Sequence, residues 1–156
     1  MKYTKKHRKA IFLDRDGVLI KDNYPVTSEQ DIHFFSDSIP FLKYVNSKGY
    51  IALVISNQTV ISRGLISENE LEVLHASINE KIIKNGGPII EKYYYCPHHP
   101  NANLETYRII CKCRKPQPGL LFEASIEYNL SLEKSIFIGD RLTDIMAGNL
   151  AGCQTI

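Results

Sequence analysis

The stretch AIFLDRDG, residues 10–17, decides the fold class of the chain. Its four apolar residues, 10–13, form a short continuous run that predicts a strand buried on both faces. Two acidic residues, Asp14 and Asp16, follow this run directly, and Gly17 then permits a sharp turn because it has no β-carbon. In open parallel sheets chemistry gathers at the carboxyl ends of strands, so Asp14 occupies the position of a catalytic group.

The remaining sequence alternates apolar runs with helical patterns. Further strands are expected over residues 50–56, 89–95 and 135–139, with the start of a fifth strand at 153–156. Helices are expected over residues 38–48, 67–84, 118–129 and 142–150. The second of these is the clearest, because Ser67 and Glu70 form an S-x-x-E capping pattern ahead of a regular apolar face. Strand–helix alternation predicts a single α/β domain over residues 1–156, with a Rossmann-like, doubly wound, mainly parallel sheet.

Composition excludes several classes of protein. With 156 residues, of which 44% are apolar and 23% charged, the chain suits one globular domain that needs no disulfides. The net charge of +2 is too close to neutral to favour nucleic acid or an anionic membrane surface as a partner. No apolar run approaches the ~20 residues that span a bilayer, and the basic start, residues 1–9, is not expected to be a signal peptide. We expect a cytoplasmic, monomeric protein that acts on a small molecule.

A second acidic pair follows the fourth predicted strand. Asp140 ends that strand, and Asp144 lies about one helical turn further on. If strands one and four are neighbours, these carboxylates converge on Asp14, and like charges ~4 Å apart repel by ~4 kcal/mol at an effective dielectric constant of about 20. A Mg²⁺ ion relieves such repulsion and also binds substrate phosphate. Taken singly, the D-x-D-G stretch is also compatible with a turn, and Asp140 with a helix cap.

Polar and basic residues at two other positions would suit a phosphate group. Ser56 ends the second predicted strand, and its hydroxyl and the backbone N–H groups after it are placed to hold a phosphate oxygen. Arg114 and Lys115 would bring two cations to an acidic, metal-bearing cleft. Alone, Ser56 is as compatible with the start of a polar loop, and the basic pair with a solvated surface.

Residues 96–113 are expected to form a loop with a metal-binding pattern of three thiols and one imidazole. These ligands are Cys96, His98, Cys111 and Cys113. Structural zinc prefers such a closed tetrahedral set, which leaves no position for water. The predicted zinc ion is therefore structural and orders a loop without a core of its own. A free thiol cluster, a disulfide, or a site in which His99 replaces His98 are the alternatives that the spacing leaves open.

Taken together, these motifs resemble a known family. The stretches FLDRDGV (12–18), SNQ (56–58) and GDRLTD (139–144), with Lys115, resemble the haloacid-dehalogenase (HAD) phosphatase superfamily. The stretch YYCPHHP (94–100), followed by CKCRKPQPG (111–119), is more specific and looks like the D-glycero-D-manno-heptose 1,7-bisphosphate 7-phosphatase family. The histidinol-phosphate phosphatase domain is similar and is the close alternative. The resemblance covers residues 10–156 and implies a HAD fold without a large cap domain, with a zinc-binding loop.

The resemblance also implies a role for each matching residue. Asp14 matches the nucleophile that forms an aspartyl-phosphate, and Asp16 matches the general acid that protonates the leaving sugar oxygen and later activates water. Ser56 and Lys115 match positions that stabilise the phosphoryl group. Mg²⁺ would be held by Asp14, the backbone carbonyl of Asp16, and Asp140. Substrate would be contacted by Asn57, Arg63 and Arg114, with Arg63 near a second phosphate.

Two features depart from the family pattern. Val60 stands where the pattern usually has glycine, and its branched side chain would narrow the substrate loop or shift its backbone. The pattern also continues beyond Ile156, through the rest of the fifth strand and a further helix. The sequence predicts a Mg²⁺-dependent phosphomonoesterase for a heptose bisphosphate. Histidinol-phosphate hydrolysis, a non-catalytic zinc-stabilised binding domain and a polynucleotide 3′-phosphatase are the alternatives, the last disfavoured by the near-neutral charge.

Overall fold

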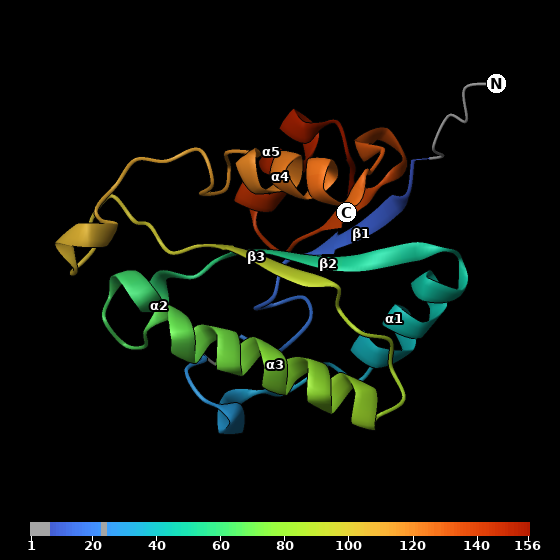
Figure 1. Cartoon of the computed structure of the whole chain (residues 1–156), viewed down its shortest axis with the longest axis horizontal. Coiled ribbons are helices and arrows are strands. Elements are labelled where there is room, and N and C mark those ends of the chain that lie inside the picture. Colours follow the sequence, from blue (N-terminus) through green and yellow to red (C-terminus); the bar gives the residue numbers. More distant parts are fainter. Residues whose placement is uncertain (1–6, 23–24) are drawn as a thin grey trace.

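A five-stranded, wholly parallel sheet forms the centre of the molecule (Figure 1). The computed structural model describes residues 7–22 and 25–156, so the signal-peptide prediction falls largely outside the described residues. The strands are β1 (Lys9–Leu13), β2 (Tyr50–Asn57), β3 (Lys92–Cys96), β4 (Ile136–Ile138) and β5 (Gln154–Thr155). Their order across the sheet is β3-β2-β1-β4-β5. The predicted parallel sheet is confirmed, and β1 is its central strand.

Helices cover both faces of the sheet, which makes the fold doubly wound as predicted. The helices are α1 (Ser38–Ser47), α2 (Thr59–Ser62), α3 (Glu68–Lys84), α4 (Gly119–Tyr128) and α5 (Leu142–Ala151), with 3₁₀ turns at Glu29–Asp31, Glu105–Tyr107 and Leu132–Lys134. Figure 1 shows α1 and α3 on one face of the sheet and α4 and α5 on the other. Within the described residues, no helix is long and apolar enough to cross a membrane.

Alternate residues of β1 enter two separate cores. Ile11 and Leu13 pack with α1 and α3, whereas Ala10 and Phe12 pack with α4 and α5. All four side chains are at most 2% exposed. Burial on both faces explains why the strand is a continuous apolar run and not an alternating one. Such a strand is a rigid base for the side chains that follow it.

The start of α3 follows the predicted capping pattern. Ser67 Oγ accepts a hydrogen bond from the Glu70 N–H at 3.2 Å, and the Glu70 carboxylate accepts one from the Ser67 N–H at 2.7 Å. The expected apolar face is buried, and it consists of Leu71, Leu74, Ile78 and Ile82. The cap and the apolar period together fix where this helix begins and which side packs against the sheet.

Strand β3 begins at Lys92, three residues later than the apolar pattern predicts. The side chain of Asn79 in α3 forms two hydrogen bonds with the backbone of Ile90. It accepts one from the Ile90 N–H and donates one to the Ile90 carbonyl, both at 3.0 Å. These two backbone groups are therefore unavailable to β2. The ladder starts only where Lys92 pairs with Leu53.

The strand order brings the carboxyl ends of β1, β2 and β4 to one edge of the sheet. Leu13 pairs with both Val54 and Ile138, so the residues that follow these positions are neighbours in space. This edge carries residues 14–17, 56–58 and 139–144. The fold thereby brings together the three segments in which the sequence predicts chemistry.

Candidate active site

A buried lysine lies at the centre of the ionised side chains at this edge. Lys115 is 3% exposed, and its Nζ lies 3.0 Å from Asp14 Oδ1 and 2.6 Å from Asp144 Oδ1. The same Nζ donates to the backbone carbonyl of Ile55 at 2.8 Å. One cation thus joins the end of β1, the end of β2 and the first turn of α5.

Three carboxylates lie within reach of one metal ion. Oxygens of Asp14, Asp140 and Asp144 lie within 4.8 Å of one another, with Asp14 and Asp144 buried and Asp140 exposed. Burial raises the pKa of Asp14, the charge of Lys115 acts against this, and the charge of Asp144 adds to it. Lys115 contacts Asp14 and Asp144, which leaves Asp140 without a contact to its ammonium, and carboxylate oxygens are ligands that Mg²⁺ prefers. The donor set therefore fits a magnesium ion.

Two glycines let the backbone approach these carboxylates closely. Gly17 has a φ of +88°, and a β-carbon there would collide with the Asp140 carboxylate. A β-carbon on Gly139 would collide with the side chain of Asp144. Any other residue at these two positions would push the acidic groups apart.

The Asp16 carboxylate lies outside this cluster and is held by two other side chains. Arg15, which is 1% exposed, donates from Nε to Oδ1 and from Nη2 to Oδ2, both at 2.9 Å. Gln58 Nε2 donates to Oδ2 at 3.1 Å. Since Asp16 also lines the cleft described below, its carboxylate is held in a fixed position on the cleft wall.

The last two residues of β2 make different contacts. Ser56 is 2% exposed, and its Oγ accepts a hydrogen bond from Gln58 Nε2 at 2.7 Å. The Asn57 side chain is bonded to the backbone of Lys115, accepting from its N–H at 3.0 Å and donating to its carbonyl at 3.2 Å. Asn57, predicted as a substrate contact, thus holds the Lys115 segment against the end of β2.

A polar cleft of about 250 Å³ collects most of the predicted site residues. It is lined by Asp14, Asp16, Ser56, Asn57, Thr59, Arg114, Lys115, Arg141, Leu142 and Thr143. Arg114 donates to the His98 carbonyl at 2.9 Å, and Arg141 pairs with Asp22 at 3.0 Å. Arg63 is exposed after α2 and is not among the lining residues. Three cationic side chains beside an acidic cluster suit a phosphate ester.

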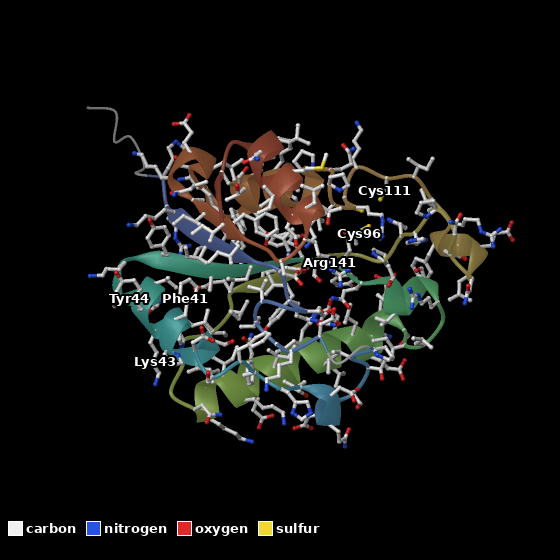
Figure 2. All side chains as sticks on the ribbon, turned by 180° about the vertical axis from the view of Figure 1, so that it is seen from behind. Phe41, Lys43, Tyr44, Cys96, Cys111 and Arg141 are labelled. Carbon is white, nitrogen blue, oxygen red and sulfur yellow. The ribbon has the colours of Figure 1, made fainter. Side chains whose placement is uncertain are left out.

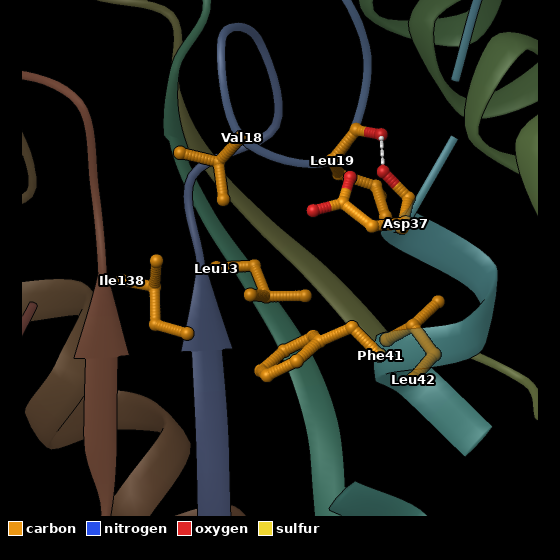
Figure 3. Close-up of a pocket in the computed structure, with 8 residues that line it drawn as sticks. Leu13, Val18, Leu19, Asp37, Phe41, Leu42 and Ile138 are labelled. Carbon is orange, nitrogen blue, oxygen red and sulfur yellow. Dashed lines mark hydrogen bonds between the residues drawn. The ribbon is translucent and has the colours of Figure 1, made fainter. Parts of the chain in front are cut away.

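A second cavity, of about 190 Å³, lies between the end of β1 and α1 (Figure 3). Its lining is mainly apolar and consists of Leu13, Val18, Leu19, Asp37, Ser38, Phe41, Leu42 and Ile138. Ser38 Oγ donates to the Leu19 carbonyl at 2.8 Å, which uses its hydroxyl proton. This cavity holds none of the predicted catalytic residues, so the chemistry belongs to the polar cleft.

The Cys/His loop brings its four predicted ligands into one cluster. The sulfur atoms of Cys96, Cys111 and Cys113 lie 3.1 to 3.5 Å apart in pairs, and all three cysteines are free. His98 Nδ1 lies 3.4 Å from Cys113 Sγ and 3.7 Å from Cys96 Sγ. Zinc–sulfur bonds of about 2.3 Å in a tetrahedron would place sulfur atoms about 3.8 Å apart. The cluster is therefore close to the size that zinc requires.

The chemistry of this cluster also fits a cation. Burial, followed by the hydrogen bond with Cys113, raises the pKa of the Cys96 thiol, so a positive charge is needed to hold Cys96 as a thiolate. His99 is used elsewhere, because its Nδ1 accepts from the Asn101 N–H at 3.0 Å. The spacing left His98 and His99 as alternatives, and the structure brings His98 to the thiols. Figure 2 labels Cys96, the last residue of β3, and Cys111, in the long loop that follows this strand.

The sequence left three residues of this site without an assigned role. Asp144 carries a signal, its place one turn after Asp140, but its contact with Lys115 depends on the tertiary fold. Arg141 lies inside the GDRLTD stretch without a pattern that distinguishes it from a surface residue. Gln58 has no signal beyond following Ser56 and Asn57, yet it contacts both Asp16 and Ser56.

Known proteins match this chain over most of its length. The HAD-hydrolase-like family model matches residues 112–156. A D-glycero-β-D-manno-heptose-1,7-bisphosphate 7-phosphatase of Photorhabdus laumondii is 37% identical over 146 residues, which are 94% of this chain and 77% of that relative. The chain belongs to this phosphatase family.

Two further members of the heptose-bisphosphate phosphatase family extend the comparison. The P. laumondii phosphatase named for the α anomer is 35% identical over 144 residues, 92% of this chain and 78% of the relative. The crystal structure of D,D-heptose 1,7-bisphosphate phosphatase from B. bronchiseptica, complexed with magnesium and phosphate, is 28% identical with a TM-score of 0.82. That match covers 94% of this chain and 78% of the other. The predicted HAD phosphatase fold is confirmed.

Proposed function

We propose that this HAD phosphatase is a Mg²⁺-dependent phosphomonoesterase that removes the 7-phosphate of D-glycero-D-manno-heptose 1,7-bisphosphate. One observation carries the proposal: the buried Asp14 carboxylate is paired with Lys115 in a polar cleft and lies within metal reach of Asp140. The names of the relatives support the substrate, and the B. bronchiseptica complex with magnesium and phosphate supports the metal.

Asp14 is the proposed nucleophile. Its carboxylate oxygen attacks phosphorus as the bond from phosphorus to the sugar oxygen breaks, which gives an aspartyl-phosphate and splits hydrolysis into two easier steps. Lys115 Nζ, 3.0 Å from Asp14 Oδ1, orients the nucleophile and offsets the charge of the phosphoryl oxygens.

Asp16 is the proposed acid–base residue. It gives a proton to the departing sugar oxygen and then takes a proton from the water that hydrolyses the aspartyl-phosphate. Its position on the cleft wall, held by Arg15 and Gln58, supports this role.

The other polar residues of the cleft are proposed to bind substrate. Ser56 Oγ and Lys115 Nζ contact the phosphoryl oxygens, and Arg114 and Asn57 contact the sugar phosphate nearby. Arg63, outside the cleft lining, is proposed to meet the second phosphate of the longer substrate at the rim. Hydrogen bonds from ionised donors are the stronger class and suit a doubly phosphorylated sugar.

Two metal ions are proposed, with different tasks. Asp14, Asp140 and the backbone carbonyl of Asp16 would hold Mg²⁺, with Asp144 close by, and the ion supplies charge neutralisation for the phosphoryl group. Cys96, His98, Cys111 and Cys113 would hold a structural Zn²⁺.

We also propose one catalytic domain over residues 1–156 that works as a cytoplasmic monomer. The single sheet shared by both apolar cores supports the one-domain organisation. All the proposed catalytic residues come from one chain, which supports a monomer as the active unit.

Release of inorganic phosphate by the purified chain tests the proposal. The β and α anomers of the heptose 1,7-bisphosphate are compared with histidinol phosphate, each with and without Mg²⁺. We expect Mg²⁺-dependent release from a heptose bisphosphate at a kcat/KM at least about tenfold above that for histidinol phosphate. A preference for histidinol phosphate would contradict the substrate assignment, and equal release without Mg²⁺ would contradict the metal.

A further inference from the structure

Gln58 connects two groups that the proposed reaction uses separately. It is 1% exposed and forms the N-cap of α2, directly after β2. Its Nε2 donates to Asp16 Oδ2 at 3.1 Å and to Ser56 Oγ at 2.7 Å. The side chain therefore joins the acid–base carboxylate to the phosphate-binding hydroxyl.

The orientation of this amide follows from its neighbours. A carboxylate offers only acceptors, so the nitrogen of Gln58, and not its oxygen, must face Asp16. Because the same nitrogen donates to Ser56 Oγ, that hydroxyl acts as an acceptor toward Gln58. The single hydroxyl proton of Ser56 is thereby left to point elsewhere, and the cleft that Ser56 lines is where a phosphoryl oxygen would receive it.

The two oxygens of Asp16 have unequal surroundings. Oδ2 accepts from Gln58 Nε2 and from Arg15 Nη2, whereas Oδ1 accepts only from Arg15 Nε. Gln58 therefore supplies the donor that makes the two oxygens differ, in addition to the two donors of Arg15. Without the Gln58 donor, Arg15 alone would hold the Asp16 carboxylate, and its link to Ser56 would be lost.

The backbone of Gln58 is bonded to the strand that carries the first member of the Cys/His cluster. Its backbone N–H donates to the carbonyl of Cys96 at 2.9 Å, and Cys96 is the first member of the Cys/His cluster. Both the backbone and the side chain of Gln58 therefore have defined partners. A residue with so many fixed contacts is suited to set the positions of others.

We propose that Gln58 is a positioning residue for the general-acid step: it holds the Asp16 carboxylate in place on the cleft wall, and it directs the Ser56 proton to the phosphoryl group. The inference rests on the proposed phosphatase function and on the acid role of Asp16. In the step itself, the Asp14 oxygen–phosphorus bond forms, the bond to the leaving oxygen breaks, and that oxygen takes the Asp16 proton.

The dependence on the leaving group tests this inference. A sugar alkoxide needs a proton to depart, whereas the p-nitrophenolate of p-nitrophenyl phosphate departs without one. General-acid catalysis contributes ~10²–10⁴-fold, so Gln58→Met should lower kcat/KM for the heptose bisphosphate about 100-fold. For p-nitrophenyl phosphate the loss should stay within about tenfold, the part due to Ser56. An equal loss on both esters would overturn the inference, as would no loss on either.

Two additional variants keep the test independent of folding. Gln58→Glu has the same shape but loses the donor, and it should show the same selective loss. In an Asp16→Asn background, Gln58→Met should cause no further selective loss, because the acid is already absent. A selective loss that persists without Asp16 would overturn the inference. Gln30→Met, at an exposed glutamine, is the matched control and should keep parental kinetics on both esters.

Failure of the proposed substrate is distinguishable from failure of this inference. If the parent chain hydrolyses another sugar monophosphate but not the heptose bisphosphate, that alkyl ester replaces it in the same comparison with p-nitrophenyl phosphate. A selective Gln58 effect there supports the inference while the substrate proposal fails. A parent chain that hydrolyses no phosphomonoester contradicts both.

Discussion

The two metal-binding clusters of this phosphatase are built on different kinds of support. Asp14 and Asp140 follow the ends of two central strands, and the buried Lys115 is paired with Asp14. In the Cys/His cluster only Cys96 belongs to a strand, and the other three members lie between β3 and α4, where the regular structure is one short 3₁₀ turn. The first cluster is held by the sheet, and we expect the second to depend on its own ion. We therefore expect one metal to serve the chemistry and the other to serve the folding of the loop.

The largest expected effect is at the nucleophile. Asp14→Asn should abolish turnover, by at least about 10⁴-fold, because the amide cannot form the aspartyl-phosphate. Folding and zinc content should remain, since the sheet and not the nucleophile holds the fold together. Phosphate release, circular dichroism and zinc analysis measure the three quantities. Asp37→Asn, at the rim of the apolar cavity, is the control and should keep its activity. Turnover equal to that of the parent would refute the role of Asp14.

Loss of a ligand in the Cys/His cluster should instead lower the stability of the protein. Cys111→Ser removes one ligand, so zinc should be lost and the free energy of unfolding should fall by more than about 4 kcal/mol. Hydrogen exchange should rise in residues 97–113 well before it rises in β1 and β2. Cys153→Ala changes a buried cysteine outside the cluster and should retain one zinc ion per chain. Unchanged protection of the loop after zinc loss would show that the ion does not order it.

A substitution at Lys115 separates the stability of the carboxylate cluster from that of the Cys/His cluster. Lys115→Met leaves Asp14 and Asp144 buried without their cation, so the free energy of unfolding should fall by about 3 kcal/mol. Added Mg²⁺ should restore part of this loss in urea unfolding, because the ion replaces the missing positive charge. Mg²⁺ should not restore the free energy of unfolding that Cys111→Ser loses. Lys112→Met, at an exposed lysine in the same segment, serves as the control. Absence of any Mg²⁺ effect would contradict a cation site formed by these carboxylates.

The smallest expected effect concerns pH and involves neither cluster directly. His75 is 3% exposed, and burial, with the charge of Arg15, lowers its pKa to about 3. Below pH ~6.5 the unfolded chain binds a proton that the folded chain refuses, so stability falls as the pH drops from about 6.5 toward 3. The slope from this residue is at most about 1.4 kcal/mol per pH unit, and His75 contributes none above pH 6.5.

Urea unfolding at pH 7 and pH 5 measures this slope. His75→Gln should lose less stability than the parent between the two values, because glutamine does not titrate. Zinc content is measured at both pH values, since protonation of the thiolates also releases zinc at low pH. Equal slopes for the parent and His75→Gln, at equal zinc content, would mean that His75 is protonated in the folded chain.

Most of the fold follows from local patterns in the sequence. The apolar runs around residues 10–13 and 50–56 identify strands because burial on both faces removes polar positions. The Ser67–Glu70 cap identifies the start of α3 because both partners lie within one turn. The start of β3 was predicted wrongly because Asn79, eleven residues away, binds the Ile90 backbone. Such a contact leaves no local pattern.

The sequence predicts those residues of the candidate site that follow the ends of strands. Asp14 and Asp140 converge because parallel strands place their ends at one edge. Other contacts join residues that are far apart in the chain. The hydrogen bonds between Asn57 and the Lys115 backbone span 58 positions, and the hydrogen bond from Gln58 to Asp16 spans 42. These contacts depend on how the crossover segments return to the sheet. No spacing rule within one segment predicts them.

The two hydrogen bonds between the Asn57 side chain and the Lys115 backbone have a consequence for which parts of the protein can change. The segment from residue 97 to residue 110 leaves the sheet beside Asn57, where Cys96 is its strand partner, and the chain returns to the same asparagine. The length and composition of residues 99–110, which contain none of the four Cys/His ligands, can therefore be exchanged without moving the ammonium group beside the nucleophile. This part of the loop can diversify, in evolution or by engineering, while the atoms beside the nucleophile keep their places.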